Sequence, residues 1–395
     1  MSMDLAVDWL TFLLRWFHVI TAIAWIGASF YFVWLDLSLQ TPAAGRARRG
    51  IGGELWAIHG GGIYEVGKYR THPTPMPERL HWFKWEAYST WLSGTALLIV
   101  IYYVKADAYL VGGDHWAGSA SAAVAGSVLY LLGALAVYEL VMRRVTKTLT
   151  TQLTFMAAYT LLLSWIAFEA FAPRAAILHV GAVLATFMAG NVFLVIIPSQ
   201  KAFVAAVEAG AEPPVDLAGN AKLRSTQNNY LTLPVLFCML SNHAAFVYGH
   251  PHAWLFVAAF SLVAAYARHY FNEKHAGRHR PLILAGAALA CVALVVLTTL
   301  TGRTDAVVRP ATADVGQLQG IVARHCTGCH ALQPTQPGYS APPAGLVFDL
   351  PEDLLPHRAR VVTSLETNFM PLANLTQMTA DERAELLSYL AQPGG

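Results

Sequence analysis

Two cysteines and a histidine near the C-terminus stand in the order Cys326-Thr-Gly-Cys329-His330. The spacing Cys-x-x-Cys-His is the attachment signature of c-type haem. Two thiols one helical turn apart can both reach the vinyl groups of a porphyrin, and the next histidine then lies under the iron as its proximal ligand. Met370 lies 40 residues after His330, and Pro371 fixes the strap that presents its sulfur. The sequence therefore predicts a covalent haem c with His330 and Met370 on the iron.

The same cysteine pair could instead be a redox-active Cys-x-x-Cys or half of a zinc site. A structural zinc site needs two further ligands at similar spacing, and the other two cysteines, Cys238 and Cys291, lie far away in apolar runs. Met378, the other methionine of the tail, precedes a helix start at 379–382 that is typical of a capping box. Haem c is therefore favoured, and a helix over 379–391 is expected to pack over the haem-bearing helix through Leu386, Leu387 and Leu390.

The elements that must carry this haem unit are unusually apolar. Of the 395 residues, 55% are hydrophobic and 13% are charged, whereas soluble domains have about 25% charged residues. The deficit lies in residues 1–300, and the net charge of +2 gives no reason to expect a nucleic-acid partner. We therefore predict an integral membrane domain over 1–300, a linker over 301–313 and a cytochrome c domain over 314–395.

Eight apolar stretches are long enough, at about 20 residues, to cross a bilayer as helices. The predicted fold is therefore all-α, a bundle of eight transmembrane helices with a C-terminal class I cytochrome c-like domain. The start Met-Ser-Met-Asp lacks a basic region, so the first stretch is expected to serve as an uncleaved anchor. The eight stretches are 9–35, 87–104, 122–142, 153–171, 176–197, 231–249, 252–270 and 281–300.

The basic residues predict how this bundle is oriented. The segments after the first, third, fifth and seventh stretches contain seventeen Lys and Arg residues, and the opposite loops contain only Lys105 and Arg174. Basic loops stay in the cytoplasm, so both termini are expected in the periplasm. Haem c is attached on the outer face of bacterial membranes, which is a second argument for a periplasmic tail. The protein is thus predicted to lie in the bacterial inner membrane.

Three histidines, His18, His179 and His243, lie in the periplasmic half of the predicted spans. Ionisable residues within spans are functional candidates, and facing histidines on two helices could hold a haem b. The segment 16–27, in which His18 is followed seven residues later by Trp-x-Gly, also resembles the first helix of haem-binding four-helix membrane families. A membrane haem b with His18 as preferred ligand is one interpretation. Histidines that are hydrogen-bonded within the bundle are the other.

A second group of polar residues belongs to the predicted cytoplasmic half. The loop between the first two spans has about 50 residues, a length that is usually functional. The backbone of its three glycines, 60–62, could approach an anion. The segment is not a phosphate loop, because the lysine of that motif is absent. Gln227, Asn228 and Asn229 could converge with this loop and with the end of the seventh span. Asn228 and Arg268 are predicted to bind a planar ligand rich in carbonyl and N–H groups. The candidate bases are His59, His81, Glu86 and His269, each of which could also be structural.

Five segments of the chain resemble the bacterial membrane-bound urate hydroxylases: 16–27, 54–62, 81–88, 228–237 and 240–243. That family joins an eight-helix urate oxidase N-terminal domain to a C-terminal cytochrome c, and the resemblance covers essentially the whole chain. It implies oxidation of urate to 5-hydroxyisourate in purine breakdown, with water as the oxygen source. It also implies that electrons pass through haem c to a soluble cytochrome c or a terminal oxidase. It implies no catalytic residues.

Other classes of function fit parts of the pattern. A membrane electron-transfer subunit could pass electrons from quinol to a cytochrome c or an oxidase without a substrate of its own. A terminal oxidase is disfavoured, because the spans lack the cluster of histidines that two haems and copper require. A transporter with a haem sensor would be expected to show paired broken helices in two repeated halves, and the sequence does not show them. Urate oxidation is the preferred prediction.

Overall fold

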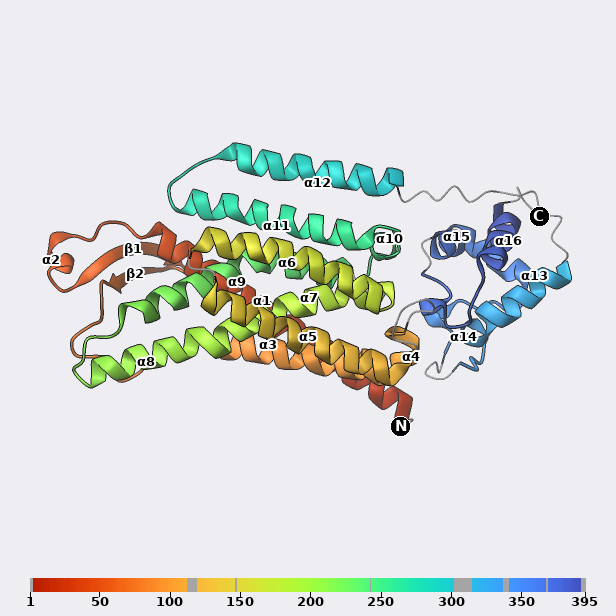
Figure 1. The fold of residues 1–395 in the computed structure, drawn as a ribbon, viewed down its shortest axis with the longest axis horizontal. Helices are drawn as coiled ribbons and strands as arrows, with labels where there is room; N and C mark the ends of the chain where they lie inside the picture. Colours follow the sequence, from red (N-terminus) through yellow and green to blue (C-terminus); the bar gives the residue numbers. More distant parts are fainter. Residues whose placement is uncertain are drawn as a thin grey trace.

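The computed structural model describes residues 3–111, 119–145, 148–241, 243–301, 315–336, 341–366 and 369–391. Within them, the N-terminal three quarters of the chain forms a bundle of long helices that run along one axis (Figure 1). These helices overlap all eight predicted stretches. They are α1 (Met3–Ser38), α3 with η1 (Trp85–Leu97, Leu98–Tyr103), α5 (Ala120–Arg144), α6 (Leu149–Ala170), α7 with η2 and α8 (Pro173–Gly190, Asn191–Ile196, Ile197–Glu208), α9 (Val215–Ser241), α11 (Ala253–His275) and α12 (Pro281–Thr301).

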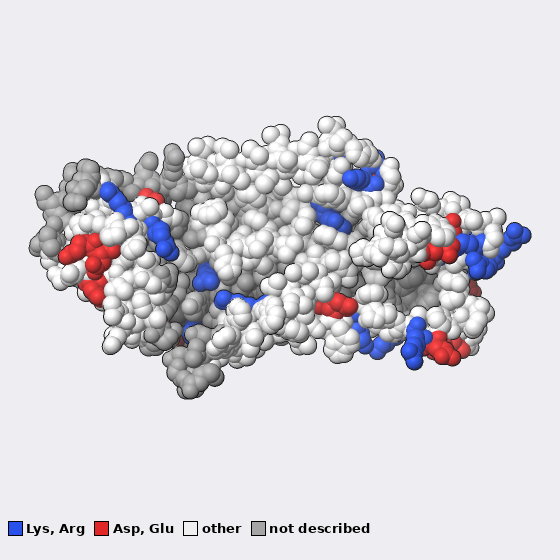
Figure 2. All heavy atoms as spheres, turned by 180° about the vertical axis from the view of Figure 1, so that it is seen from behind, with Lys and Arg blue, Asp and Glu red and all other residues white. Residues whose placement is uncertain are grey.

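Five helices in the described part of the chain are long and apolar enough to cross a membrane: Trp9–Ser38, Ala120–Arg144, Leu149–Ala170, Pro173–Glu208 and Pro281–Thr301. The remaining long helices are less apolar, because α9 opens with a polar half and α11 ends in one. Helix α3 has only 13 residues before the π-helical turn η1 follows. Figure 2 shows the charged side chains mainly toward the two ends of the molecule, with a largely uncharged surface between them.

The loop after α1 contains an antiparallel hairpin, so the all-α prediction is wrong for this segment. Strand β1 (Ile51–His59) pairs with β2 (Gly62–Tyr69), and His59 opposes Gly62 across the turn. Gly60 and Gly61, which form the turn, have φ values of 56° and 80°. A two-residue turn with two positive φ angles requires glycine or asparagine. The glycines that suggested an anion contact therefore serve as a hairpin turn.

The hairpin and the C-terminal domain lie at opposite ends of the bundle, and the N-terminus lies at the same end as the C-terminal domain (Figure 1). The basic segment that contains the hairpin is thus remote from the tail. Large apolar side chains are exposed along α1 and α12, with Trp16 61% and Leu289 71% accessible. Apolar surface of this extent is typical of a protein that contacts lipid.

The tail has its own hydrophobic core. It consists of α13 (Val315–Val322), η3 (Ala323–Thr327), α14 (Gly328–His330), η4 (Pro343–Gly345), η5 (Pro351–His357), α15 (Arg358–Glu366), η6 (Leu372–Asn374) and α16 (Ala380–Ala391). Leu386 and Leu390 of α16 are fully buried against α13, which agrees with the predicted last helix. The predicted linker lies, apart from Thr301, outside the described residues.

Candidate functional site

The haem-attachment motif lies on one helical segment of the tail. Cys326 belongs to η3, and Cys329 and His330 belong to α14, which continues it. His330 is buried, and its Nδ1–H donates to the carbonyl oxygen of Leu346 at 3.0 Å. This bond leaves the Nε2 lone pair for a metal, the usual arrangement of a histidine ligand. Burial lowers the pKa of His330, so the imidazole is neutral as a ligand must be.

The surroundings of the two cysteines do not favour a redox-active pair or a zinc site over haem. Burial raises the pKa of the Cys326 thiol to about 12 and also raises that of Cys329, whereas redox-active cysteines have lowered pKa values. No group of three or more His, Cys, Asp and Glu side chains in the described ranges could hold a metal ion. A zinc site would therefore lack its further ligands. The residues present fit a c-type haem.

The two tail methionines have different environments. Met378 is 4% exposed in the hydrophobic core, and its backbone is held on both sides by the Asn374 side chain. Met370 is half-buried on the strap between α15 and η6. Its N–H donates to the carbonyl of Ser364 at 3.0 Å, and its own carbonyl accepts from Arg383 at 2.7 Å. Met378 therefore fills the core, and Met370 is the tail methionine whose environment fits an iron ligand.

The expected capping box closes the start of α16. The Glu382 carboxylate accepts from the Thr379 N–H at 2.8 Å, and the Glu382 N–H donates to the Thr379 hydroxyl at 3.2 Å. The bond from the Thr379 N–H, together with one from the Thr379 hydroxyl and the nearby His325, holds the pKa of Glu382 down at about 2. An unfolded glutamate has a pKa of roughly 4.3. Glu382 therefore stabilises the tail above that pH, and the stabilisation is lost as the pH falls toward 2.

We expect Glu382→Gln to flatten the pH dependence of tail stability between pH 5 and pH 2. Thr379→Ala should lower the free energy of unfolding at pH 7 by about 1 kcal/mol, the usual cost of a lost cap. Urea unfolding of the full-length protein, followed by amide hydrogen exchange in the tail, measures both effects. Glu366→Gln, at an exposed glutamate of α15, is the control. Equal pH profiles for the two glutamine variants would contradict this assignment.

A buried arginine in the bundle has donors without acceptors. Arg268 of α11 is 5% exposed, its Nε–H donates to Asn229 Oδ1 at 3.1 Å, and its guanidinium lies 3.9 Å from the centre of the Phe30 ring. Arg268 Nη2 and Asn229 Nδ2 are both buried without a hydrogen-bond partner. None of the ion pairs among the described residues includes Arg268. A buried charge without a partner costs several kcal/mol, so this arrangement between α1, α9 and α11 is suited to binding an anion.

Asn228 is not brought together with Arg268, contrary to the expectation that the two bind one ligand. Its Nδ2 donates to the Met188 carbonyl at 3.0 Å, and its Oδ1 accepts from Asn191 at 2.8 Å. Neighbouring residues on a helix point about 100° apart, so Asn229 rather than Asn228 faces α11. The three consecutive amides marked this part of α9, but the sequence could not show which of them faces the site.

Asn228 belongs to a buried polar network that sequence analysis missed. Arg224 pairs with Glu139 at 3.0 Å and donates to Asn191 at 2.9 Å, while the Tyr138 hydroxyl donates to Gln227 at 2.6 Å. The network ties α5, η2 and α9 together, and its donors and acceptors are largely used within it, which is the pattern of a structural anchor. Glu139 lies inside a predicted span, and an ionisable residue in a span is the signal that could have identified it.

The four candidate bases occupy different environments. His59, at the end of β1, and His81 are exposed. Glu86, in the first turn of α3, is half-buried, and its Oε2 atom is buried without a partner. His269 is half-buried, with Nδ1 2.6 Å from the hydroxyl of Tyr230. Glu86 and His269 therefore remain the better candidates for a base in the interior.

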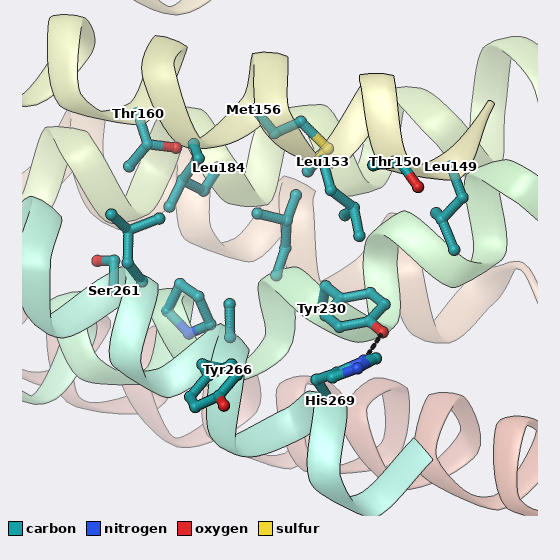
Figure 3. A pocket seen from close by; sticks show the side chains of 15 residues that line it. Leu149, Thr150, Leu153, Met156, Thr160, Leu184, Tyr230, Ser261, Tyr266 and His269 are labelled. Carbon is teal, nitrogen blue, oxygen red and sulfur yellow. Dashed lines mark hydrogen bonds between the residues drawn. The ribbon is translucent and has the colours of Figure 1, made fainter. Parts of the chain in front are cut away.

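An apolar cleft lies between α6, α7, α9 and α11. It has a volume of about 410 Å³ and is lined mostly by aliphatic side chains, with Ser261 and Tyr266 among its few polar groups. The hydrogen-bonded pair of Tyr230 and His269 lies at one end of it (Figure 3). A cleft of this kind suits a ligand with one polar end and a long apolar body.

The three outer histidines, considered for a haem b, lie in different environments. His179 is fully buried, with Nε2 2.6 Å from the Ser127 hydroxyl and Nδ1 2.7 Å from the Ala175 carbonyl, so both ring nitrogens are engaged. His243 is exposed in the turn after α9. His18 Nδ1 lies 3.1 Å from the Thr90 carbonyl, which leaves Nε2 for a ligand role. Of the three, His18 is the one whose Nε2 is left for a ligand role by the bonds that the structure shows.

The sequence comparisons bear on the bundle that contains these sites. The urate oxidase N-terminal family matches residues 4–299. The chain belongs to the urate oxidase N-terminal family. No curated protein and no solved structure matches it.

The match to the urate oxidase N-terminal family covers three quarters of the chain, including Phe30, Asn229 and Arg268. It supports a urate-related oxidoreductase activity and urate as the small-molecule substrate. It ends before α13, so the assignment of the tail rests on the tail's own residues. The buried pair of Arg268 and Asn229 therefore lies within the matched region.

Proposed function

We propose that the protein is a membrane-bound urate hydroxylase, which oxidises urate to 5-hydroxyisourate. The observation that carries the proposal is the pair of buried, unpartnered donors on Arg268 and Asn229 inside a urate oxidase N-terminal domain. Urate is a planar anion at neutral pH, with carbonyl and N–H groups around its edge. A guanidinium offers parallel N–H donors that match such an edge, and Asn229 adds a donor beside them. Phe30 lies against the guanidinium.

The reaction balances with water as the oxygen source. Urate and one water give 5-hydroxyisourate, two protons and two electrons. Arg268 and Asn229 hold and orient the anion, and the protons go to a base, for which Glu86 and His269 are the candidates. Cys326, Cys329, His330 and Met370 would hold a haem c, which would supply a one-electron acceptor. A soluble cytochrome c or a terminal oxidase is the final acceptor.

The proposed setting is the bacterial inner membrane, with all eight helical segments across the bilayer and the tail in the periplasm. The basic segments and the cytochrome tail lie toward opposite ends of the bundle, which supports this orientation (Figure 1). Urate then binds in the cytoplasmic half, where Arg268 and Asn229 lie.

Anaerobic mixing of the purified protein with urate is expected to reduce haem c, with two haems reduced per urate oxidised. The growth of the α-band of the reduced haem measures this stoichiometry directly. Xanthine, which lacks the oxygen at C8, serves as the control purine and should leave the haem oxidised. A haem that stays oxidised in the presence of urate would contradict direct electron transfer.

An electron-transfer subunit that oxidises quinol is the second candidate. It is favoured by the cleft between α6, α7, α9 and α11, in which Tyr230 and His269 could hold a quinol headgroup while the apolar walls hold its tail. The same anaerobic experiment separates the two functions. Reduction of haem c by a quinol but not by urate would select the second.

A further inference from the structure

The tail contacts the bundle through the strap that carries Met370, residues 369–374. Phe369 packs on the main core of the bundle, and its ring centre lies 6.3 Å from that of Tyr248. Tyr248 belongs to the short helix α10 (Ala245–Tyr248) and is only 4% exposed. On the other side of Met370, η6 lies against α4 (Ala106–Tyr109), the most extensive contact between a tail element and a bundle element in the described residues. The docking contacts therefore flank the predicted iron ligand on both sides.

The same strap is fastened to the core of the tail. Met370 bonds through its N–H to Ser364 of α15 and through its carbonyl to Arg383 of α16. Arg383 also donates to the carbonyl of Leu365 at 2.8 Å. The strap is thus held to the tail by backbone bonds and to the bundle by side-chain packing. A shift of the tail on the bundle would have to move the Met370 segment with it.

We propose that residues 369–374 are the docking element that seats the cytochrome tail on the bundle, and that the Tyr248–Phe369 contact positions the Met370 side of the haem site toward the bundle. This inference rests on the proposed function, since it assumes haem c in the tail. Electron transfer weakens steeply with distance, so the docked side determines where electrons enter the haem. Small contacts between domains permit relative motion by default. One aromatic contact next to the ligand can therefore set the transfer rate.

A double-mutant cycle tests the contact in the full-length protein. We expect Tyr248→Leu and Phe369→Leu each to slow anaerobic reduction of haem c by urate about tenfold, and the double variant to be no slower than either single variant, as for two residues in one contact. Amide hydrogen exchange in residues 106–109 and 245–248 should accelerate in all three variants. Reduction of the same haem by ascorbate should be unchanged, because it needs no docking. Leu350→Ala, at an exposed leucine of the tail, is the control and should match the wild type.

Additive slowing by the two substitutions, unchanged exchange in these segments, or an equal loss of reduction by ascorbate would overturn the docking role. The exchange measurement requires no substrate. If wild-type haem c is not reduced by urate, the proposed function fails, while hydrogen exchange still tests the docking contact. The two failures are therefore distinguishable.

Discussion

Replacing Cys326 and Cys329 by serine is expected to remove covalent haem and to lower urate-dependent electron transfer to background. Both thioether bonds require these thiols, and His330 and Met370 alone would hold a haem only by coordination. Urate binding to the bundle should persist, because Arg268 and Asn229 belong to a different domain. Haem staining after denaturing electrophoresis, a cytochrome c reduction assay and urate binding measure the three expectations.

Cys291→Ser is the matched control for this variant, since Cys291 is exposed on α12 and far from the motif. It should leave both haem staining and electron transfer at wild-type levels. A serine double variant that still carries covalent haem, or that oxidises urate undiminished, would contradict the role of the tail.

Arg268→Met is expected to weaken urate binding by on the order of 30-fold or more, the usual effect of removing one partner of a buried charge pair. The stability of the urate-free protein should not fall, because the substitution removes a buried charge that has no ion-pair partner there. Urate should also stabilise the variant less than it stabilises the wild type. Thermal unfolding with and without urate measures both properties in one experiment.

Two comparisons make the arginine prediction specific. Arg280→Met changes an arginine with a side chain that is 63% exposed and should leave urate affinity unchanged. Asn229→Leu should weaken urate binding, whereas Asn228→Leu should mainly lower stability, because Asn228 is bonded within the buried network. Unchanged affinity together with lower stability in Arg268→Met would show that Arg268 is structural instead.

Features encoded by residues close together in the chain could be predicted from the sequence. The haem motif spans five residues, and the helix that carries it brings Cys326, Cys329 and His330 together without help from the rest of the fold. The capping box of Thr379 and Glu382 is equally local, and the structure forms it. The long apolar runs likewise predicted where the helices of the bundle lie.

The hairpin shows how a local signal can still be misinterpreted. Gly60 and Gly61 carried the information for a two-residue turn, but the flanking strands alternate weakly and lie in a region that otherwise predicted a loop. The paired strands became visible only in the structure, where the residues of β1 other than Gly52 each have a partner in β2.

Which side chains meet across the bundle was decided by the tertiary structure alone. Composition and pattern determined the apolar helices, the haem motif and the end of the molecule that bears the basic loops. The rotation of α9 and α11 decided that Asn229 meets Arg268, and the packing around His179 decided that its two nitrogens bond to protein groups. The physical reason is that a helix turns about 100° per residue. A sequence therefore marks the helix that carries a polar group, and only the packing of its neighbours fixes which group faces the site.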